Sequence, residues 1–253
     1  HGTAIQLSNL NKTFKGGKVA VKDLCLSVDF GETFGLLGPN GAGKSTALSI
    51  VSGLLDPSAG SAHVHGLDCA SNRDAVYRTL GVCPQFDTIW KDLTVAEHFA
   101  VYTRLRGVPM ASETAQIQQI AEMVGLDGDS FDNKAEELSG GMQRRLSIGI
   151  SLVGNPRVWL CDEPTTGLDP QTRRDIWEIV EKQKNKGRAI VITTHAMEEA
   201  DTLCSKIGII SSGGLRCIGT QLHLKYRVGD GYKLTLSMEK ELEEGAPEGS
   251  VVD

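Results

Sequence analysis

The sequence has 253 residues, of which 40% are hydrophobic and 23% charged, and its formal net charge is -6 at pH 7. These values are typical of a globular protein with enough apolar side chains for one sizeable core. Sequence-independent nucleic-acid binding usually needs a basic face, so no nucleic-acid partner is expected for this acidic chain.

No part of the sequence is expected to cross a membrane by itself. The longest apolar runs, such as residues 189–192, are far shorter than the roughly 20 residues that a transmembrane helix needs. No signal peptide is visible. The chain opens at His1 rather than at Met, so we expect it to be cut from something longer. The isolated domain is expected to be soluble.

Short strands and one helix are predicted in the first third of the chain. Residues 4–7 begin an alternation of apolar and polar side chains, which residues 19–28 continue. The apolar run at residues 33–37 ends in a glycine-rich turn, and a helix is predicted from about 43 to 52. Residues 60–68 are typical of a strand and a turn.

The middle of the chain, about residues 86–155, has a helical pattern. Apolar side chains recur at helical spacing in residues 95–105, 112–124 and 141–152. We interpret this stretch as a helical subdomain inserted into an α/β domain.

Strands return after the helical stretch. Apolar runs at residues 158–161 and 189–194 alternate with helical segments. This rhythm predicts a mainly parallel sheet that is covered on both faces. The acidic residues 239–253 contain Gly and Pro, so they are predicted to be a linker or tail after a domain of residues 1–238.

One glycine-rich segment carries a phosphate-binding pattern. Residues 38–46 fit G-x-x-x-x-G-K-[ST], in which glycines let the backbone point successive N–H groups at an anion. The helix that follows directs its positive end at the same phosphates. Lys44 is expected to reach the β- and γ-phosphates, and the hydroxyl of Ser45 to hold Mg²⁺. The predicted nucleotide ligands here are Gly38, Pro39, Asn40, Gly41, Ala42, Gly43, Lys44, Ser45 and Thr46.

Four polar residues stand where predicted strands end, namely Gln85, Asp162, Glu163 and His195. In parallel sheets, ligands bind beyond the carboxyl ends of strands. Phosphoryl transfer needs charge neutralisation and a positioned nucleophile. Asp162 suits Mg²⁺ or its waters, and Glu163 can accept a proton from an attacking water. His195 can contact the γ-phosphate, and Gln85 the metal or the water. Taken singly, each could instead have a capping or packing role.

Several segments resemble the motifs of ATP-binding cassette (ABC) proteins. Residues 138–142, Leu-Ser-Gly-Gly-Met, resemble the signature motif of that family, and we call them the signature segment. Residues 162–169 resemble its Walker B motif and D-loop, while Gln85 and His195 resemble its Q-loop and H-loop. The motifs occur in the family's order, and the resemblance extends from about Ile5 to Leu236.

The resemblance implies a fold and a mechanism. The fold is a P-loop NTPase core with a mainly parallel sheet, an N-terminal antiparallel β subdomain and an inserted helical subdomain. Two such domains close face to face and sandwich two ATPs, each held by one domain's phosphate loop and the other's signature segment. Ser139, Gly140 and Gly141 would bind the partner's nucleotide at a helix N-terminus, and Asp169 would reach across the same interface.

The resemblance also implies a biological setting. The chain would be the cytosolic motor domain of a membrane transporter, lying at the cytosolic face of the membrane. Its partners would be a second cassette and the transmembrane domains of the same transporter. Residues 86–100 occupy the region that contacts those transmembrane domains in the family.

Met142 stands where most of the family has glutamine, so the polar contact of that glutamine is lost. Methionine at this position is similar to transporter subfamily A, whose substrates are mostly lipids. Residues 214–219, 223–225 and 229–236 add to this resemblance.

Two further side-chain roles are expected. Phe14 resembles the aromatic residue that stacks on adenine in the family, with a core phenylalanine at a turn as the alternative. Arg144 and Arg145 are expected to lie on a solvated helix face.

Three competing functions stay open. A soluble ABC-type ATPase of DNA repair or translation usually carries a long coiled coil or a second cassette, and neither is visible. Another P-loop class, such as a GTPase or small-molecule kinase, would leave the signature segment unexplained, and no Asn-Lys-x-Asp guanine motif occurs. A non-hydrolysing regulatory cassette is expected to lack the base or the histidine, yet Glu163 and His195 are both present.

Overall fold

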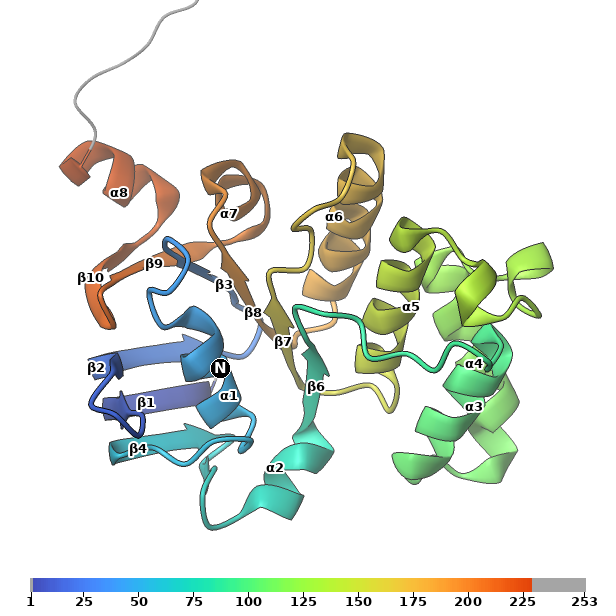
Figure 1. The fold of residues 1–253 in the computed structure, drawn as a ribbon, viewed down its shortest axis with the longest axis horizontal. Helices are drawn as coiled ribbons and strands as arrows, with labels where there is room; N and C mark the ends of the chain where they lie inside the picture. The colour runs from blue at the N-terminus through green and yellow to red at the C-terminus, as the bar shows by residue number, and fades with distance from the viewer. Residues whose placement is uncertain (1, 229–253) are drawn as a thin grey trace, which may run out of the picture.

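Two β-sheets lie side by side and helices flank them (Figure 1). The computed structural model describes residues 2–228. The predicted tail at residues 239–253 and the subfamily-like residues 229–236 lie outside this range.

The N-terminal sheet is antiparallel and four-stranded, in the order β2-β1-β4-β5. The alternation along its first strand buries Ile5 and Leu7 and leaves Gln6 exposed, and Leu10 is buried after a register shift in the ladder between Leu7 and Leu10. The buried side chains pack in one core with residues of the phosphate-loop region, including Phe34 and Leu48. Its strands are β1 (Thr3–Thr13), β2 (Val19–Asp29), β4 (Ala59–Val64) and β5 (Leu67–Asp68).

The central sheet has six strands in the order β10-β9-β3-β8-β7-β6, and only the β9–β10 pair is antiparallel. It therefore matches the predicted mainly parallel sheet. All residues of β3 and β8 are buried, as expected for strands that are covered on both faces. Its strands are β3 (Thr33–Leu37), β6 (Leu80–Cys83), β7 (Val158–Asp162), β8 (Ala189–Thr194), β9 (Lys206–Ser211) and β10 (Gly214–Gly219).

Parallel pairing has a consequence for function. Because β3, β6, β7 and β8 run in one direction, their carboxyl ends meet at one edge of the sheet. The phosphate loop and the four polar residues at predicted strand ends follow these strands.

The helices α3, α4 and α5 follow β6 and precede β7 in the chain, and Figure 1 shows them grouped beside the central sheet. They start and end close to the three helices predicted for the middle of the chain. The helix α2 was not predicted. The helices are α1 (Lys44–Val51), α2 (Arg73–Thr79), α3 (Val95–Leu105), α4 (Met110–Val124), α5 (Gly140–Leu152), α6 (Pro170–Lys184), α7 (Met197–Leu203) and α8 (Gln221–Val228).

Within residues 2–228, no helix has both the length and the apolar character that crossing a bilayer requires.

Candidate nucleotide site

The phosphate loop links the buried end of β3 to the first residue of α1, and two of its glycines are fixed by close backbone approach. A Cβ atom at Gly38 would lie 2.3 Å from the carbonyl oxygen of Ile210. At Gly43, whose φ is 106°, a Cβ would lie 2.2 Å from the carbonyl oxygen of Ala20. Only glycine fits at either position, so the loop is held tightly against β2 and β9.

The side chain of Lys44 packs against the phosphate loop and is only 4% exposed. Its Nζ donates to the carbonyl oxygens of Gly38, at 2.8 Å, and Pro39, at 3.2 Å. The same Nζ lies 3.1 Å from Oε1 of Glu163, which is 5% exposed. The lysine predicted to bind phosphate is therefore paired with the predicted base in this structure.

Oxygen ligands suited to Mg²⁺ converge at the end of β7. Ser45 Oγ donates to Oδ1 of Asp162 at 3.1 Å, and Thr193 Oγ1 donates to the same oxygen. In the described part of the chain, no group of three or more His, Cys, Asp or Glu could hold a metal. One hydroxyl and one carboxylate fit Mg²⁺, which is usually held by one or two carboxylates together with substrate phosphates and waters.

Glu163 is held in an unusual backbone conformation beside the lysine. Its φ is 45°, in the left-handed region that is costly for a residue with a side chain. The backbone N–H of Glu163 donates to Thr193, to the carbonyl oxygen at 3.1 Å and to Oγ1 at 2.9 Å. Its Oε2 accepts from Thr166 Oγ1 at 3.0 Å and lies 3.3 Å from Nδ1 of His195. The surrounding structure therefore fixes both the backbone and the carboxylate.

The surroundings of Glu163 keep its carboxyl ionised. Burial raises its pKa, but hydrogen bonds from Lys44 and Thr166 and the charges of Lys44 and His195 outweigh burial and lower the pKa below its ordinary value. A lowered folded-state pKa stabilises the fold above the ordinary pKa of Glu, and this contribution is lost as the pH falls through the lowered value. At neutral pH Glu163 is thus available as a proton acceptor.

A cavity of about 240 Å³ brings most of the predicted site together. Gln85 and Phe14 open onto it with the phosphate loop, although both are far from that loop in sequence. Phe14 is 39% exposed and lies beside Lys12, whose Nζ is 5.5 Å from the ring centroid, so it is not a core residue. The lining residues are Phe14, Lys18, Ala20, Asn40, Gly41, Gly43, Lys44, Ser45, Thr46, Gln85 and Glu163.

Phe14→Ala is expected to weaken ATP binding by about 1–3 kcal/mol, because an exposed ring at the cavity can stack on adenine. GTP should bind only somewhat more weakly than ATP, since stacking tolerates different bases. Titration calorimetry with both nucleotides measures the effect. Thermal unfolding of the variant is the control, and a folded variant with unchanged ATP affinity would contradict the stacking role of Phe14.

The signature segment lies elsewhere, since none of its residues lines this cavity. Ser139 caps α5 and its side chain accepts from the backbone N–H of Met142 at 3.3 Å. A Cβ at Gly141 would lie 2.8 Å from Cγ2 of Thr172, so the start of α5 abuts the start of α6. Met142 packs against the main hydrophobic core, which is a use for methionine in place of a polar side chain.

Asp169 is the cap of α6 and is likewise absent from the cavity lining. Its Oδ1 accepts from the backbone N–H groups of Gln171 and Thr172, each at 3.0 Å. Ser139, Gly140, Gly141 and Asp169 thus do not line the cavity of the phosphate loop, and their nucleotide-binding roles stay predictions.

Arg144 corrects one expectation, because it lies 4% exposed rather than on a solvated face. Its guanidinium donates to the carbonyl oxygens of Pro84 and Pro164, each at 2.7 Å, and pairs with Asp87 at 2.8 Å. It thus ties the segment after β6 to the segment after β7. A signal was present in the sequence, because Arg144 shares a helix face with Ile148 and Ser151, which are also buried.

The side chain of Arg145 is also hydrogen-bonded, and its NH1 donates to the carbonyl oxygens of Val124 and Gly125 at 3.0 and 2.9 Å.

Arg144→Gln is expected to lower the free energy of unfolding by about 2 kcal/mol or more, because buried carbonyls and Asp87 lose a charged donor. Arg145→Gln, at the more exposed site, should cost less. Urea denaturation of both variants tests this, and equal losses would contradict it.

The fold and this site together define an ABC-type ATPase domain. The family profile described as "ABC transporter" matches residues 21–166, more than half of the chain, so the chain belongs to the ABC transporter family. Several similar relatives are A family members of this family. It is 46% identical over 249 residues to ABC transporter A family member 12 of Arabidopsis thaliana, covering 96% of this chain and 27% of the relative. ABC transporter A family member 7 of Dictyostelium discoideum is 46% identical over 236 residues, covering 93% and 28%.

Solved structures confirm the predicted fold class. The ATP-binding subunit of an ABC transporter superposes with a TM-score of 0.81 at 25% identity, covering 89% of this chain and 93% of that one. A post-hydrolysis dimer of the ATP-binding cassette MJ0796, bound to ADP and Pi, gives a TM-score of 0.77 at 26% identity, with coverages of 85% and 98%. The chain spans about a quarter of the length of its curated relatives.

Proposed function

We propose that this chain is the motor domain of a transporter and hydrolyses ATP bound at the phosphate loop. The observation that carries the proposal is the convergence of Lys44, Ser45, Asp162, Glu163 and His195 at one edge of the central sheet. This set supplies phosphate binding, a metal site and a general base.

ATP binding and base activation are coupled through Lys44. The lysine now contacts Glu163 at 3.1 Å, and arriving β- and γ-phosphates would draw its ammonium group away. Glu163 then accepts the proton of the attacking water, while His195, 3.3 Å from its Oε2, keeps the carboxylate oriented and contacts the γ-phosphate. Ser45, Asp162 and Gln85 would hold Mg²⁺, which when bound would neutralise charge on the phosphates.

The complete site is shared between two cassettes. The N-terminus of α5, with Ser139, Gly140 and Gly141, lies outside the phosphate-loop cavity, so in one molecule it faces no nucleotide. In a face-to-face dimer it would bind the partner's γ-phosphate, with Asp169 beside it. The dimeric form of the MJ0796 cassette supports this arrangement.

Transport is the second part of the proposal. It is supported by relatives named as ABC transporters, of which this chain covers about a quarter. A lipid substrate rests on the resemblance of the signature segment to subfamily A. The motor domain would then lie at the cytosolic face of a membrane, bound to the transmembrane domains of its own transporter.

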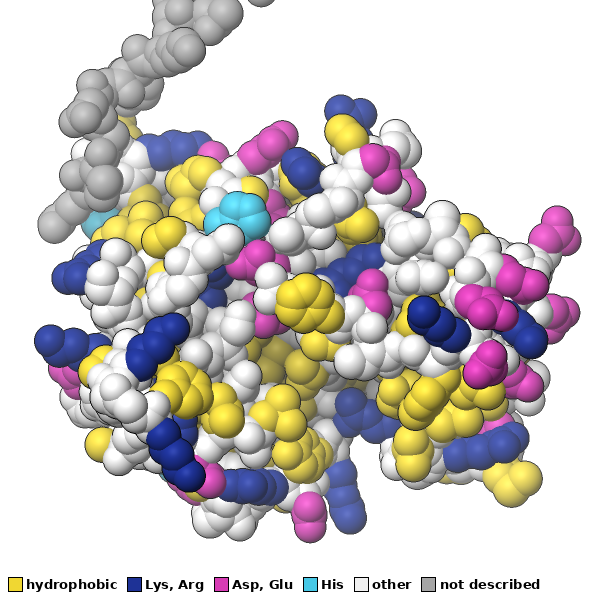
Figure 2. Space-filling model, in the orientation of Figure 1, with side chains coloured by type: hydrophobic (Ala, Val, Ile, Leu, Met, Phe, Trp, Pro, Cys, Tyr) yellow, Lys and Arg dark blue, Asp and Glu magenta, His cyan; other side chains and the backbone are white. Residues whose placement is uncertain are grey.

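A surface on this chain suits such a membrane partner. Hydrophobic side chains gather along a hollow in the middle of the face shown in Figure 2. Phe86, directly after Gln85, is 77% exposed, and Trp90 is 49% exposed. Trp90 stacks on His98 and Tyr102, whereas Phe86 is exposed directly beside a residue of the nucleotide cavity and would transmit closure of that cavity to a bound transmembrane segment.

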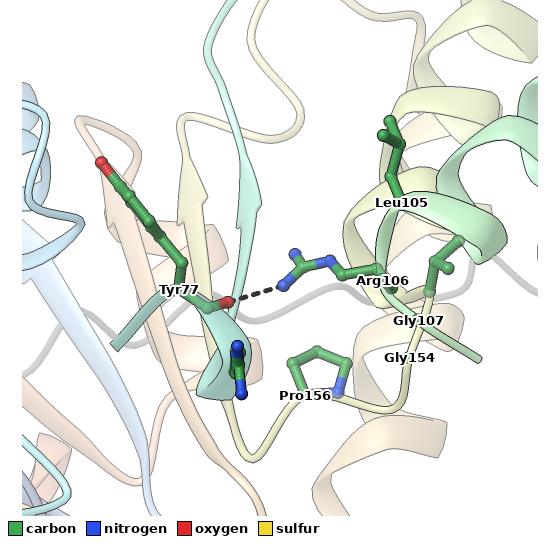
Figure 3. Close-up of a pocket in the computed structure, with 8 residues that line it drawn as sticks. Tyr77, Leu105, Arg106, Gly107, Gly154 and Pro156 are labelled. Atoms are coloured by element: carbon green, nitrogen blue, oxygen red, sulfur yellow. Dashed lines mark hydrogen bonds between the residues drawn. The ribbon is translucent and has the colours of Figure 1, made fainter. Parts of the chain in front are cut away.

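A cleft of about 470 Å³ lies between α2, the end of α3 and the loop after α5. Figure 3 shows Arg106 reaching across it, where NH1 donates to the carbonyl oxygen of Tyr77 at 2.7 Å. Leu105 at its rim is 73% exposed. Its mixed apolar and basic lining, which includes Arg78, fits an amphipathic segment with acidic side chains.

The experiment that tests the proposed function is the concentration dependence of ATP hydrolysis by the purified chain with Mg²⁺. Because two chains complete each site, the rate should rise more than linearly with protein concentration. A strictly linear rise at full ATP occupancy would argue against the shared site. Absence of hydrolysis at every concentration would contradict the ATPase assignment.

A further inference from the structure

A separate cavity of about 320 Å³ lies where α4, the end of α6 and the start of β8 meet. It shares no residue with the nucleotide cavity. Its lining combines apolar side chains with amides and two cations, among them Asn155, Gln183, Lys186 and Arg188.

The two cations of this cavity lack acidic partners. Across residues 2–228, no ion pair joins Lys186 or Arg188 to a carboxylate within 4.0 Å. Arg188 is only 5% exposed, and its single side-chain hydrogen bond runs from NH2 to Oδ1 of Asn155 at 2.7 Å. Its Nε and NH1 are buried without any partner. Leaving charged donors unsatisfied is costly, so the site favours a ligand that accepts hydrogen bonds.

The electrostatics of the cavity support an anion. Burial lowers the pKa of Arg188, and burial together with the charge of Arg188 lowers the pKa of Lys186. Burial therefore disfavours the charged form of Arg188, and for the more exposed Lys186 partial desolvation and the charge of Arg188 act in the same direction. A negative charge between them would relieve both effects.

The side chain of Gln183 has an acceptor atom that needs a hydrogen-bond donor from the ligand. It is 1% exposed, and its Oε1 is buried and accepts no hydrogen bond. A ligand that offers both negative oxygens and one hydroxyl would satisfy the guanidinium and this amide oxygen together. Inorganic phosphate has this combination at neutral pH, and a phosphomonoester has it in its singly protonated form, whereas sulfate is unprotonated at neutral pH.

We propose that a phosphate group, free or as a phosphomonoester, binds between α4 and α6, held by Arg188 and Lys186 with Gln183 accepting from its hydroxyl. The bound group would join the helical stretch to the central sheet, because α4 belongs to the former and Arg188 directly precedes β8. A soluble phosphate compound and a lipid headgroup are the two sources of this chemistry.

Calorimetric titration with inorganic phosphate tests the proposal. A non-hydrolysable ATP analogue with Mg²⁺ fills the nucleotide cavity first, so that phosphate cannot bind at the phosphate loop. One phosphate per chain should then bind, and sulfate should bind more weakly. Lys186→Gln should weaken phosphate binding roughly tenfold, while Lys182→Gln, an exposed change on α6 outside the cavity, should leave it unaltered.

Arg188→Gln should abolish binding, and if this buried change prevents folding, the exposed Lys186→Gln still decides the result. Absence of phosphate binding beside the ATP analogue, or equal affinity in the parent and Lys186→Gln, overturns the proposal.

Vesicles distinguish the two sources of the phosphate group. A lipid headgroup is identified if the chain sediments with phosphatidic acid vesicles but not with phosphatidylcholine vesicles. This sedimentation should be lost in Lys186→Gln and kept in Lys182→Gln. Phosphate binding without vesicle sedimentation identifies a soluble phosphate compound. Sedimentation that Lys186→Gln does not change belongs to another surface and overturns the headgroup source.

Discussion

Replacing Glu163 by Gln should lower ATP turnover by about 10²–10⁴-fold, the usual contribution of a general base. The change keeps the shape of the side chain and removes the proton acceptor. ATP binding should persist, because Lys44, Ser45 and Asp162 still hold the phosphates and the metal. Loss of a negative charge beside Lys44, now 3.1 Å away, should even favour binding of the phosphates.

Steady-state hydrolysis and nucleotide titration on the same preparation measure the two effects separately. Glu198→Gln is the matched control, since Glu198 is an exposed residue of α7 outside the nucleotide cavity. The control should hydrolyse ATP at the parent rate. Parent-like turnover in Glu163→Gln would show that another group accepts the proton.

Lys44→Ala should weaken ATP binding about 100-fold or more, because the lysine supplies charge-assisted hydrogen bonds to two phosphate groups. Lys44 is buried at 4% exposure inside the phosphate loop, whereas Lys18, the other lysine that lines the cavity, is exposed. The change also leaves Glu163 without its main favourable charge, so repulsion between this carboxylate and the γ-phosphate should weaken binding further.

Titration calorimetry with ATP and Mg²⁺ checks this prediction, with thermal unfolding as evidence that the variant is folded. Lys182→Ala, an exposed change on α6, should bind ATP like the parent. Unchanged affinity in a folded Lys44→Ala protein would remove this lysine from the site.

Local patterns predicted much of the fold. The phosphate loop and the strands around it were predicted because glycine placement and apolar runs mark sharp turns and buried strands. The helix over residues 95–105 was predicted with the bounds of α3, where an apolar stripe coincides with a capping box at Thr94 and Glu97. The helix α2 was missed because only Val76 of its seven residues is buried, which leaves no apolar periodicity.

Interactions between distant segments could not be predicted from local patterns. The contact of Lys44 with Glu163 joins two segments that only the parallel sheet brings together. The burial of Arg144 depends on carbonyl groups of two loops that follow different strands. The chemical roles of Gln85, His195 and the signature segment stay predictions, because they depend on the nucleotide and on a second cassette.

The molar mass of Glu163→Gln in the presence of ATP and Mg²⁺ tests the central claim most directly. Because ATP should remain unhydrolysed between two cassettes, gel filtration should show a stable dimer that is absent without ATP. A monomer that binds ATP without hydrolysing it would contradict the shared site, and Met142 would be the first residue to examine. A monomer that hydrolyses ATP at the parent rate would contradict both the shared site and the role of Glu163.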